Sequence, residues 1–157
     1  MKKALYVGSF DPITLGHLDI VRQASLVFDH VHIGMGINPK KTPMFDTATR
    51  LLMVTDSLSE IGLTDNVTVG CYTGSMMEEA RNRNATAIVR GLRQISDFGD
   101  EFTINGMATR AIPNTPLVYF ICRQDFLHVS SSSVKEMASL GEDFSWMVTR
   151  TVEKYLK

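Results

Sequence analysis

The residues best placed to hold an anion lie near the start of the chain, where an apolar run ends in a turn. Gly8 ends the run Ala4–Val7, and Gly16 and His17 stand at the first turn of an expected helix. The first N–H groups of a helix lack partners within it and carry partial positive charge, so they favour anions. Gly8 lets a ligand approach the backbone closely. We expect His17 to donate a ring N–H to an anion over this helix start, although a surface or capping histidine is the alternative.

Two further stretches bring cations to the ends of apolar segments. Arg90 ends the run Ala87–Val89 and begins Arg90-Gly91-Leu92-Arg93. A charge at the end of an apolar strand is costly without a partner, and the planar guanidinium suits phosphate. Lys41 lies in a loop that two prolines stiffen. The alternatives are a structural ion pair for Arg93 and a solvated surface lysine for Lys41.

A serine run opens another expected helix. Ser130, Ser131 and Ser132 offer hydroxyls and free N–H groups at its start, which form an anion site. A plain helix cap uses the same groups and is compatible with this role. Ser133-Val134-Lys135-Glu136 fits the S-x-x-E capping box, so we expect Ser133 and Glu136 to close it.

The composition indicates one compact domain. The chain has 157 residues, 44% apolar content and a net charge of −1, which does not suggest a nucleic-acid or membrane surface. It contains no apolar run of about 18 residues, and the basic start is followed by a run too short and broken for a signal peptide. Cys71 and Cys122 are expected to be buried free thiols, and the cytoplasm is the expected compartment.

Apolar runs of strand length alternate with helical periodicity along the chain, which predicts a doubly wound, Rossmann-like α/β domain with a five-stranded parallel sheet. A central position is expected for Leu117–Cys122, because this run is almost wholly apolar. His30 and His32 should share one face of their strand; without a nearby third ligand we interpret them as polar residues rather than a metal site. The expected strands are Lys3–Gly8, His30–Ile37, Val67–Tyr72, Ala87–Leu92 and Leu117–Cys122. The expected helices are Leu15–Phe28, one from Asp46 to about Gly62, Ser75 to about Asn84, Asp97–Ala111, one opening at Ser130–Ser133, and Phe144–Tyr155. Loops near residues 9, 39, 73, 91 and 123 should then line one edge of the sheet, with a nucleotide across it.

Several of these segments resemble one enzyme family. Gly8-Ser9-Phe10-Asp11-Pro12 followed by Gly16-His17 resembles the (H/T)xGH signature of nucleotidylyltransferases, and its Thr14-x-Gly16-His17 form resembles the phosphopantetheine adenylyltransferase family. The resemblance spans Ala4 to about Glu136 in four ordered segments. It implies transfer of AMP from MgATP to 4′-phosphopantetheine, giving dephospho-coenzyme A and pyrophosphate. It further implies Mg²⁺ as cofactor, a homohexamer, and coenzyme A as an inhibitor.

The same resemblance implies roles for individual residues. His17 would stabilise the transition state, with Lys41 and Arg90 as the other catalytic residues. Acceptor contacts would come from Ser9, Lys41, Met76 and Arg90. ATP contacts would come from Ser9, Phe10, His17, Gly91, Leu92, Arg93, Glu101, Phe126, Leu127, His128, Val129, Ser130, Ser131 and Ser132. The sequence departs from the family pattern at Gly99, Asp100 and His128 in the segments that contact ATP. It departs at Gly74, Ser75 and Ala108 on the acceptor side, and these departures leave the ATP side better supported.

Two other functions compete with this one. Another small nucleotidylyltransferase would act on nicotinate mononucleotide or an alcohol phosphate, and the Lys41 loop and the Arg90–Arg93 stretch argue against it. A non-catalytic nucleotide-binding module would not need the intact Gly16-His17 pair. Adenylyl transfer to a phosphate needs alignment and charge neutralisation rather than a catalytic triad, because the attacking phosphate is already ionised.

Overall fold

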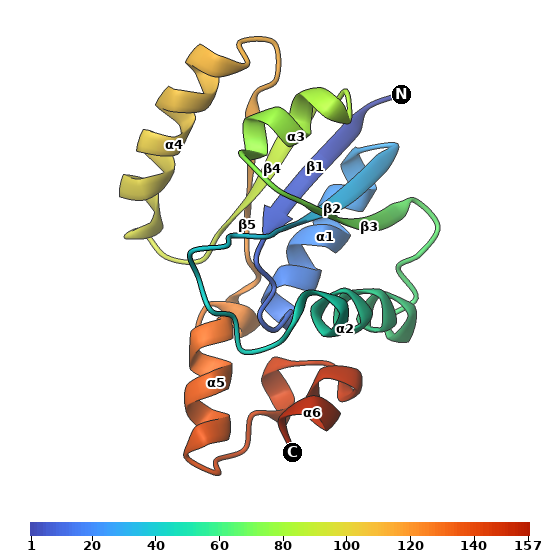
Figure 1. Cartoon of the computed structure of the whole chain (residues 1–157), viewed down its shortest axis with the longest axis vertical. Helices are drawn as coiled ribbons and strands as arrows, with labels where there is room; N and C mark the ends of the chain where they lie inside the picture. Colours follow the sequence, from blue (N-terminus) through green and yellow to red (C-terminus); the bar gives the residue numbers. More distant parts are fainter.

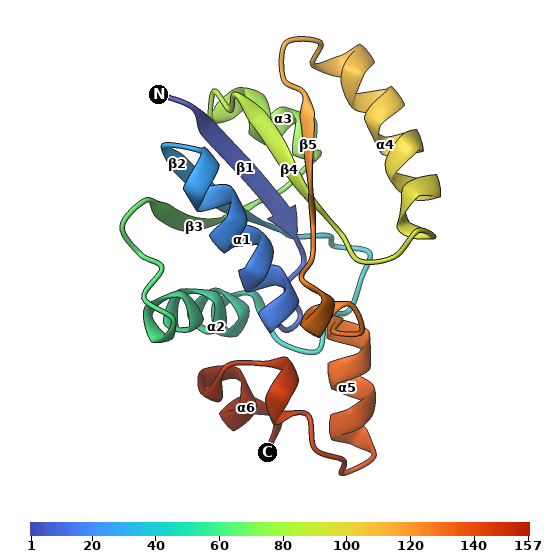
Figure 2. The ribbon, with the colours of Figure 1, turned by 180° about the vertical axis from the view of Figure 1, so that it is seen from behind.

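A computed structural model, which describes all 157 residues, contains one five-stranded parallel sheet with helices on both faces (Figures 1 and 2). The strand order is β3-β2-β1-β4-β5, and every pairing is parallel. The strands are β1 (Lys3–Gly8), β2 (His30–Gly36), β3 (Val67–Tyr72), β4 (Ala87–Leu92) and β5 (Leu117–Ile121). The α/β class and the five parallel strands predicted from the sequence are confirmed.

The helices divide unequally between the two faces of the sheet. The larger core joins the sheet to α1 (Leu15–Val27), α2 (Thr47–Glu60), α5 (Ser131–Ser139) and α6 (Arg150–Leu156). A core of six residues lies on the other face, under α3 (Met76–Asn82) and α4 (Asp97–Ala111). Short 3-10 turns occupy Gln124–Phe126 and Ser145–Met147. Figure 1 shows α3 in front of the sheet, and Figure 2 shows α1 and α2 on the opposite side. No helix has the length and apolar character that crossing a bilayer requires.

Two expectations about elements were wrong. β5 is an edge strand, and Ile121 at its end is 72% exposed, so its apolar run does not reflect a central position. The segment Phe144–Tyr155 is not one helix, because Thr149 has extended backbone angles and its hydroxyl caps α6 by accepting the N–H of Val152. The apolar residues before Thr149 therefore belong to the 3-10 turn, and those after it belong to α6.

The end of α2 is fastened to the start of α6. The carboxylate of Glu60 accepts the backbone N–H groups of Arg150 and Thr151, each at 3.0 Å. The hydroxyls of Ser57 and Thr149 share a buried 2.7 Å hydrogen bond. These contacts hold the C-terminal end of α2. The first turn, at the opposite end of this helix, faces the carboxyl ends of the strands.

Candidate active site

Two cavities meet at the carboxyl ends of β1 and β4. The first has a volume of about 450 Å³ and the second about 750 Å³. Val7, Gly8 and Arg90 line both. Of the predicted site residues, the first cavity is lined by His17, Arg90, Gly91, Arg93, Glu101, Val129, Ser130, Ser131 and Ser132. The second is lined by Ser9, Lys41, Met76 and Arg90. The fold therefore divides the predicted residues between two adjoining cavities, largely as the ATP and acceptor assignments did.

His17 is fixed by a capping box at the start of α1. The backbone N–H of Thr14 donates to His17 Nδ1 at 3.1 Å, and the hydroxyl of Thr14 accepts the backbone N–H of His17. Since a backbone N–H can only donate, Nδ1 must be unprotonated and the ring proton resides on Nε2. Burial, together with the charge of Arg93, lowers the pKa of His17 to about 4. The side chain is therefore a neutral N–H donor at the rim of the first cavity.

The Phe10 side chain is buried in the core against this turn and lines neither cavity. Its side chain is 1% exposed, and its ring packs edge-on against that of His17, with centroids 5.2 Å apart. A Cβ at Gly8 would lie 2.8 Å from the Phe10 ring, so glycine is required there. The backbone of Phe10 is left-handed, with φ of 46°. This burial leaves only the backbone of Phe10 for the expected contact with ATP.

Arg90 is held in place by Glu101. Its Nε lies 3.1 and 3.0 Å from the two carboxylate oxygens of Glu101, and its Nη2 also donates to that group. Burial lowers the pKa of Arg90, but the hydrogen bonds and charge of Glu101 outweigh it, so the net pKa is raised. Glu101 thus holds the permanently charged guanidinium of Arg90 between the two cavities. Its effect on a ligand would pass through Arg90, besides any direct contact that it makes.

The remaining cation of the first cavity has no acidic partner. Arg93 Nη1 donates to the carbonyl of Val129 at 3.4 Å, while its backbone N–H donates to Asp97. No carboxylate lies within ion-pair distance of its side chain. The alternative of a structural ion pair for Arg93 was therefore wrong, and its charge is left for a ligand.

The start of α5 also faces the first cavity. Ser130, not Ser133, is the N-cap, and the capping box joins Ser130 to Ser133, which corrects the expected pairing of Ser133 with Glu136. Ser131 donates its hydroxyl to the carbonyl of Pro12 at 2.8 Å, which ties α5 to the turn after β1. The N–H groups of Ser131 and Ser132, in the first turn, have no acceptor within the helix.

Asp11, which the sequence analysis treated only as part of a turn, anchors the Lys41 loop. Its carboxylate accepts the N–H groups of Met44 and Phe45 at 2.8 and 3.0 Å, and Lys135 lies 3.3 Å away. Burial raises the pKa of Asp11, but the two N–H groups and Lys135 together lower it below its ordinary value. A charged carboxylate thus joins the Gly8–Pro12 turn, the lysine loop and α5.

Arg50 was also missed, and so was the role of Thr14 as the cap of α1. Arg50 is 3% exposed, donates through Nη1 to the Ser9 carbonyl at 2.7 Å, and leaves Nε without a partner. The signal for Thr14 was present, because Thr14-Leu15-Gly16-His17 has capping-box spacing with histidine in place of glutamate. No comparable signal exists for Arg50, whose acceptor is a backbone carbonyl 41 residues away.

Some predicted residues lie outside both cavities. Leu92 is buried in the core, and Phe126 and Leu127 are half-buried behind the start of α5. His128 is exposed and lines neither cavity. The structure adds Asp97 and Asp100 to the first cavity, where they are carboxylates near the predicted anion groups. Cys71 is only half-buried, whereas Cys122 is buried, and both thiols are free.

The chain contains no group of three His, Cys, Asp or Glu side chains arranged to hold a metal ion. Mg²⁺ in nucleotide sites is commonly held by one or two carboxylates together with substrate phosphates. Asp97 and Asp100 match that smaller donor set, since both line the first cavity. The residues present thus fit a cation that arrives with a triphosphate rather than one resident in a protein cage.

Known proteins of similar sequence and a known protein of similar structure are both described as adenylyltransferases. The model of the cytidylyltransferase-like family matches residues 5–137. A phosphopantetheine adenylyltransferase from Alkaliphilus oremlandii is 42% identical over 98% of this chain and 96% of that protein. One from Desulfosudis oleivorans is 40% identical over 100% of this chain and 92% of that protein. A solved structure described as a nicotinate-nucleotide adenylyltransferase from Vibrio parahaemolyticus, 22% identical, superposes with a TM-score of 0.74 over 99% of this chain and 92% of its own, which supports the fold.

Proposed function

Since the chain belongs to the phosphopantetheine adenylyltransferase family, within the cytidylyltransferase-like proteins, we infer that it transfers AMP from ATP to 4′-phosphopantetheine. The products are dephospho-coenzyme A and pyrophosphate, and the reaction belongs to coenzyme A synthesis. A phosphate oxygen of the acceptor forms a bond to the α-phosphorus of ATP, and the bond from that phosphorus to the pyrophosphate oxygen breaks. The electron pair of the broken bond leaves with pyrophosphate.

The observation that carries this proposal is the position of Arg90, whose side chain lines both cavities. With ATP in the first cavity and the acceptor in the second, its guanidinium lies where the two reacting phosphates meet. Lys41 supplies a second cation on the acceptor side. Two anions that repel each other in water would thus meet between two positive charges, of which Glu101 fixes that of Arg90; this removes much of the barrier.

His17 would act on the charge that develops at the α-phosphate. Its Nε2–H is the only ring proton that the capping box allows, and the low pKa keeps the ring neutral near pH 7. Arg93 and the N–H groups of Ser131 and Ser132 would hold the β- and γ-phosphates at the start of α5. No residue needs to act as a base, because the attacking phosphate is ionised.

We propose that Mg²⁺ enters with ATP as part of the substrate and neutralises charge on the triphosphate. Asp97 and Asp100 are the carboxylates of the first cavity that would reach it. This proposal is tested by measuring turnover with ATP in excess chelator. Full activity without divalent cations would refute it.

The acceptor is tested by pyrophosphate release from ATP with each of three acceptors. We expect turnover with 4′-phosphopantetheine and none with nicotinate mononucleotide or a simple alcohol phosphate. Turnover with either of the other two would identify a different small nucleotidylyltransferase. ATP binding without turnover of any acceptor would identify a non-catalytic nucleotide-binding module.

We further propose that the chain forms a homohexamer. The helix α4, the loop before it and the neighbouring edge strand β5 expose large apolar side chains that a monomer would leave in water: Ile95, Phe98, Phe102, Met107 and Ile121. Light scattering on the purified protein tests the assembly, and a monomer would refute it. We also propose a cytoplasmic location and inhibition by coenzyme A, which combines the pantetheine and adenylyl parts of the product; cell fractionation and inhibition kinetics test these two proposals.

A further inference from the structure

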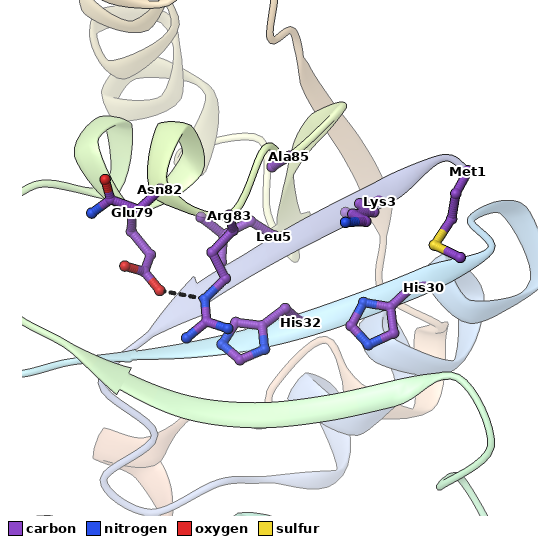
Figure 3. Close-up of a pocket in the computed structure, with 10 residues that line it drawn as sticks. Met1, Lys3, Leu5, His30, His32, Glu79, Asn82, Arg83 and Ala85 are labelled. Carbon is purple, nitrogen blue, oxygen red and sulfur yellow. Dashed lines mark hydrogen bonds and ion pairs between the residues drawn. The ribbon is translucent and has the colours of Figure 1, made fainter.

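A third cavity, of about 450 Å³, lies at the amino ends of the strands, away from the reaction (Figure 3). Lys3 and His30 begin β1 and β2 and are partners in the sheet register. His32 follows on the same face of β2, and Arg83 comes from the end of α3. The end of α3, a helix of seven residues, forms one wall of the cavity through Glu79, Asn82 and Arg83. None of these side chains lines either cavity of the candidate active site.

His32 is buried in this cavity's wall with one ring nitrogen unsatisfied. The side chain is 5% exposed; its Nδ1 shares a 2.8 Å hydrogen bond with the hydroxyl of Thr68, and its Nε2 has no partner. A buried polar atom without a partner is unfavourable, so a native structure rarely keeps one without a reason. Burial and, next, the charge of Arg83 lower the pKa of His32 to about 4, so the ring is neutral at pH 7.

Arg83 lies against this ring. A Cβ at Gly70 would stand 3.2 Å from both His32 Nε2 and Arg83 Nη2, so the two groups approach the same glycine. Figure 3 shows the Arg83 side chain descending from α3 beside His32, with Glu79 to one side. Arg83 Nε donates to Glu79 at 2.6 Å, which leaves the Nη groups for another acceptor. Its side chain is 41% exposed and therefore has room to adjust.

The charge in the cavity is positive on balance. Lys3 and Arg83 contribute two cations, and Glu79 is the only carboxylate in the wall. Both cations can donate to an anion. His32 Nε2 needs either an acceptor or a donor, according to which ring nitrogen carries the proton. A phosphate group near neutral pH satisfies all three, because its oxygens accept from Arg83 and Lys3 while its remaining O–H can donate to an imidazole. A carboxylate or sulfate offers acceptors alone, so it satisfies Nε2 only in the tautomer that carries the ring proton there.

We propose that this cavity is a binding site for the phosphate group of a small molecule, separate from the site of AMP transfer. Arg83 and Lys3 bind the phosphate oxygens, and His32 Nε2 takes its missing hydrogen bond from the same group. The site needs no contribution from the reacting nucleotide. Its existence is independent of the proposed transferase activity.

The four histidines of the chain provide local reporters, because His30 and His32 line this cavity while His17 lines the first cavity. The experiment titrates the full-length protein with inorganic phosphate and follows the imidazole signals by NMR. We expect saturable shifts of the His30 and His32 signals, with sulfate binding more weakly than phosphate. Shifts confined to His17 would overturn the proposal.

Arg83→Gln should weaken phosphate binding at His30 and His32 by about tenfold or more, because it removes a charged donor. Arg81→Gln is the matched control: it lies on the same helix, donates to the carbonyl of Ala111, and does not line the cavity. AMP transfer should be unchanged in both variants. If Arg83→Gln fails to fold, Lys3→Gln provides the same comparison. Equal affinity in the Arg83 and Arg81 variants would show that an adventitious ion only is bound. Unperturbed His30 and His32 signals in the unmodified protein would show that no phosphate binds in this cavity, which would overturn the proposal.

Discussion

Asp11→Asn should separate acceptor binding from ATP binding. In the structure, the Asp11 carboxylate accepts two backbone N–H groups from the loop that carries Lys41 and also contacts Lys135. Asparagine has nearly the same shape, but its amide oxygen can accept from only one side. Its NH₂ group would then face the second N–H group, donor against donor, so the loop would lose part of its attachment while the core stays filled.

The size of the effect follows from these contacts. Leaving one partly buried N–H unpaired costs about 1–3 kcal/mol, and replacing a charged acceptor by a neutral one removes about 1 kcal/mol more. The Lys135 contact adds at most about 1 kcal/mol, because that side chain is 37% exposed. The sum is about 2–5 kcal/mol of loop anchoring. Since some of it will appear as lower stability, we expect the acceptor KM to rise about 10- to 100-fold.

The assay is steady-state pyrophosphate release with each substrate varied in turn. The KM for ATP should change by less than about threefold, because the capping box of His17 and the start of α5 remain intact. Asp46→Ala is the matched control: it removes the cap of α2, where Asp46 accepts the N–H of Thr49. It should cost about 1 kcal/mol of stability without changing the acceptor KM. Equal rises in both KM values for Asp11→Asn, or none, would refute the anchoring argument.

The other variants and conditions test single parts of the site. His17→Ala should reduce kcat by about 100-fold or more while ATP affinity falls much less, since its partner is charge formed in the transition state; equal losses in calorimetry and kinetics would contradict this. Lys41→Ala should raise the acceptor KM, whereas Lys40→Ala, its neighbour on the same loop, should not; the reverse result would move the role by one residue. Removal of Mg²⁺ by a chelator should abolish turnover, and addition of excess Mg²⁺ should restore it. Folding keeps His17 and His32 neutral, with pKa values of about 4 against an ordinary 6.5, so the unfolded chain binds protons first as the pH falls. Denaturant unfolding should therefore show stability that is complete above pH 6.5 and declines from there to pH 4; no decline in that window would refute the buried neutral state.

The sheet could be predicted from the sequence because each strand is a short apolar run bounded by a turn or cap. Several boundaries agree with the structure, among them Lys3–Gly8, Val67–Tyr72 and Asp97–Ala111. The position of β5 could not be predicted in the same way. An apolar run looks alike whether helices cover both of its faces or it stands at an edge, as this one does.

The cations of the candidate site were found from their types and positions at strand ends, but their partners were not. Arg90 is fixed by Glu101, a residue of the following helix whose orientation no local pattern specifies. An ion pair was the alternative for Arg93, and that side chain has no carboxylate partner and donates only to the carbonyl of Val129. Asp11 was visible in a recognised turn, yet its hydrogen bonds to residues 33 and 34 positions away depend on the folded loop.

The order in which the chain is synthesised matters for the contacts of α2. The turn that contains Ser9 leaves the ribosome early, and its carbonyl can meet Arg50 only once α2 has formed. The far end of that helix is then secured by Glu60 only when residues 150 and 151 have been added. A nascent polypeptide stalled before this point would carry every proposed catalytic group but would lack the hydrogen bonds from Glu60 that secure the end of α2. Catalytic competence should therefore appear late in translation, at the stage when α6 docks.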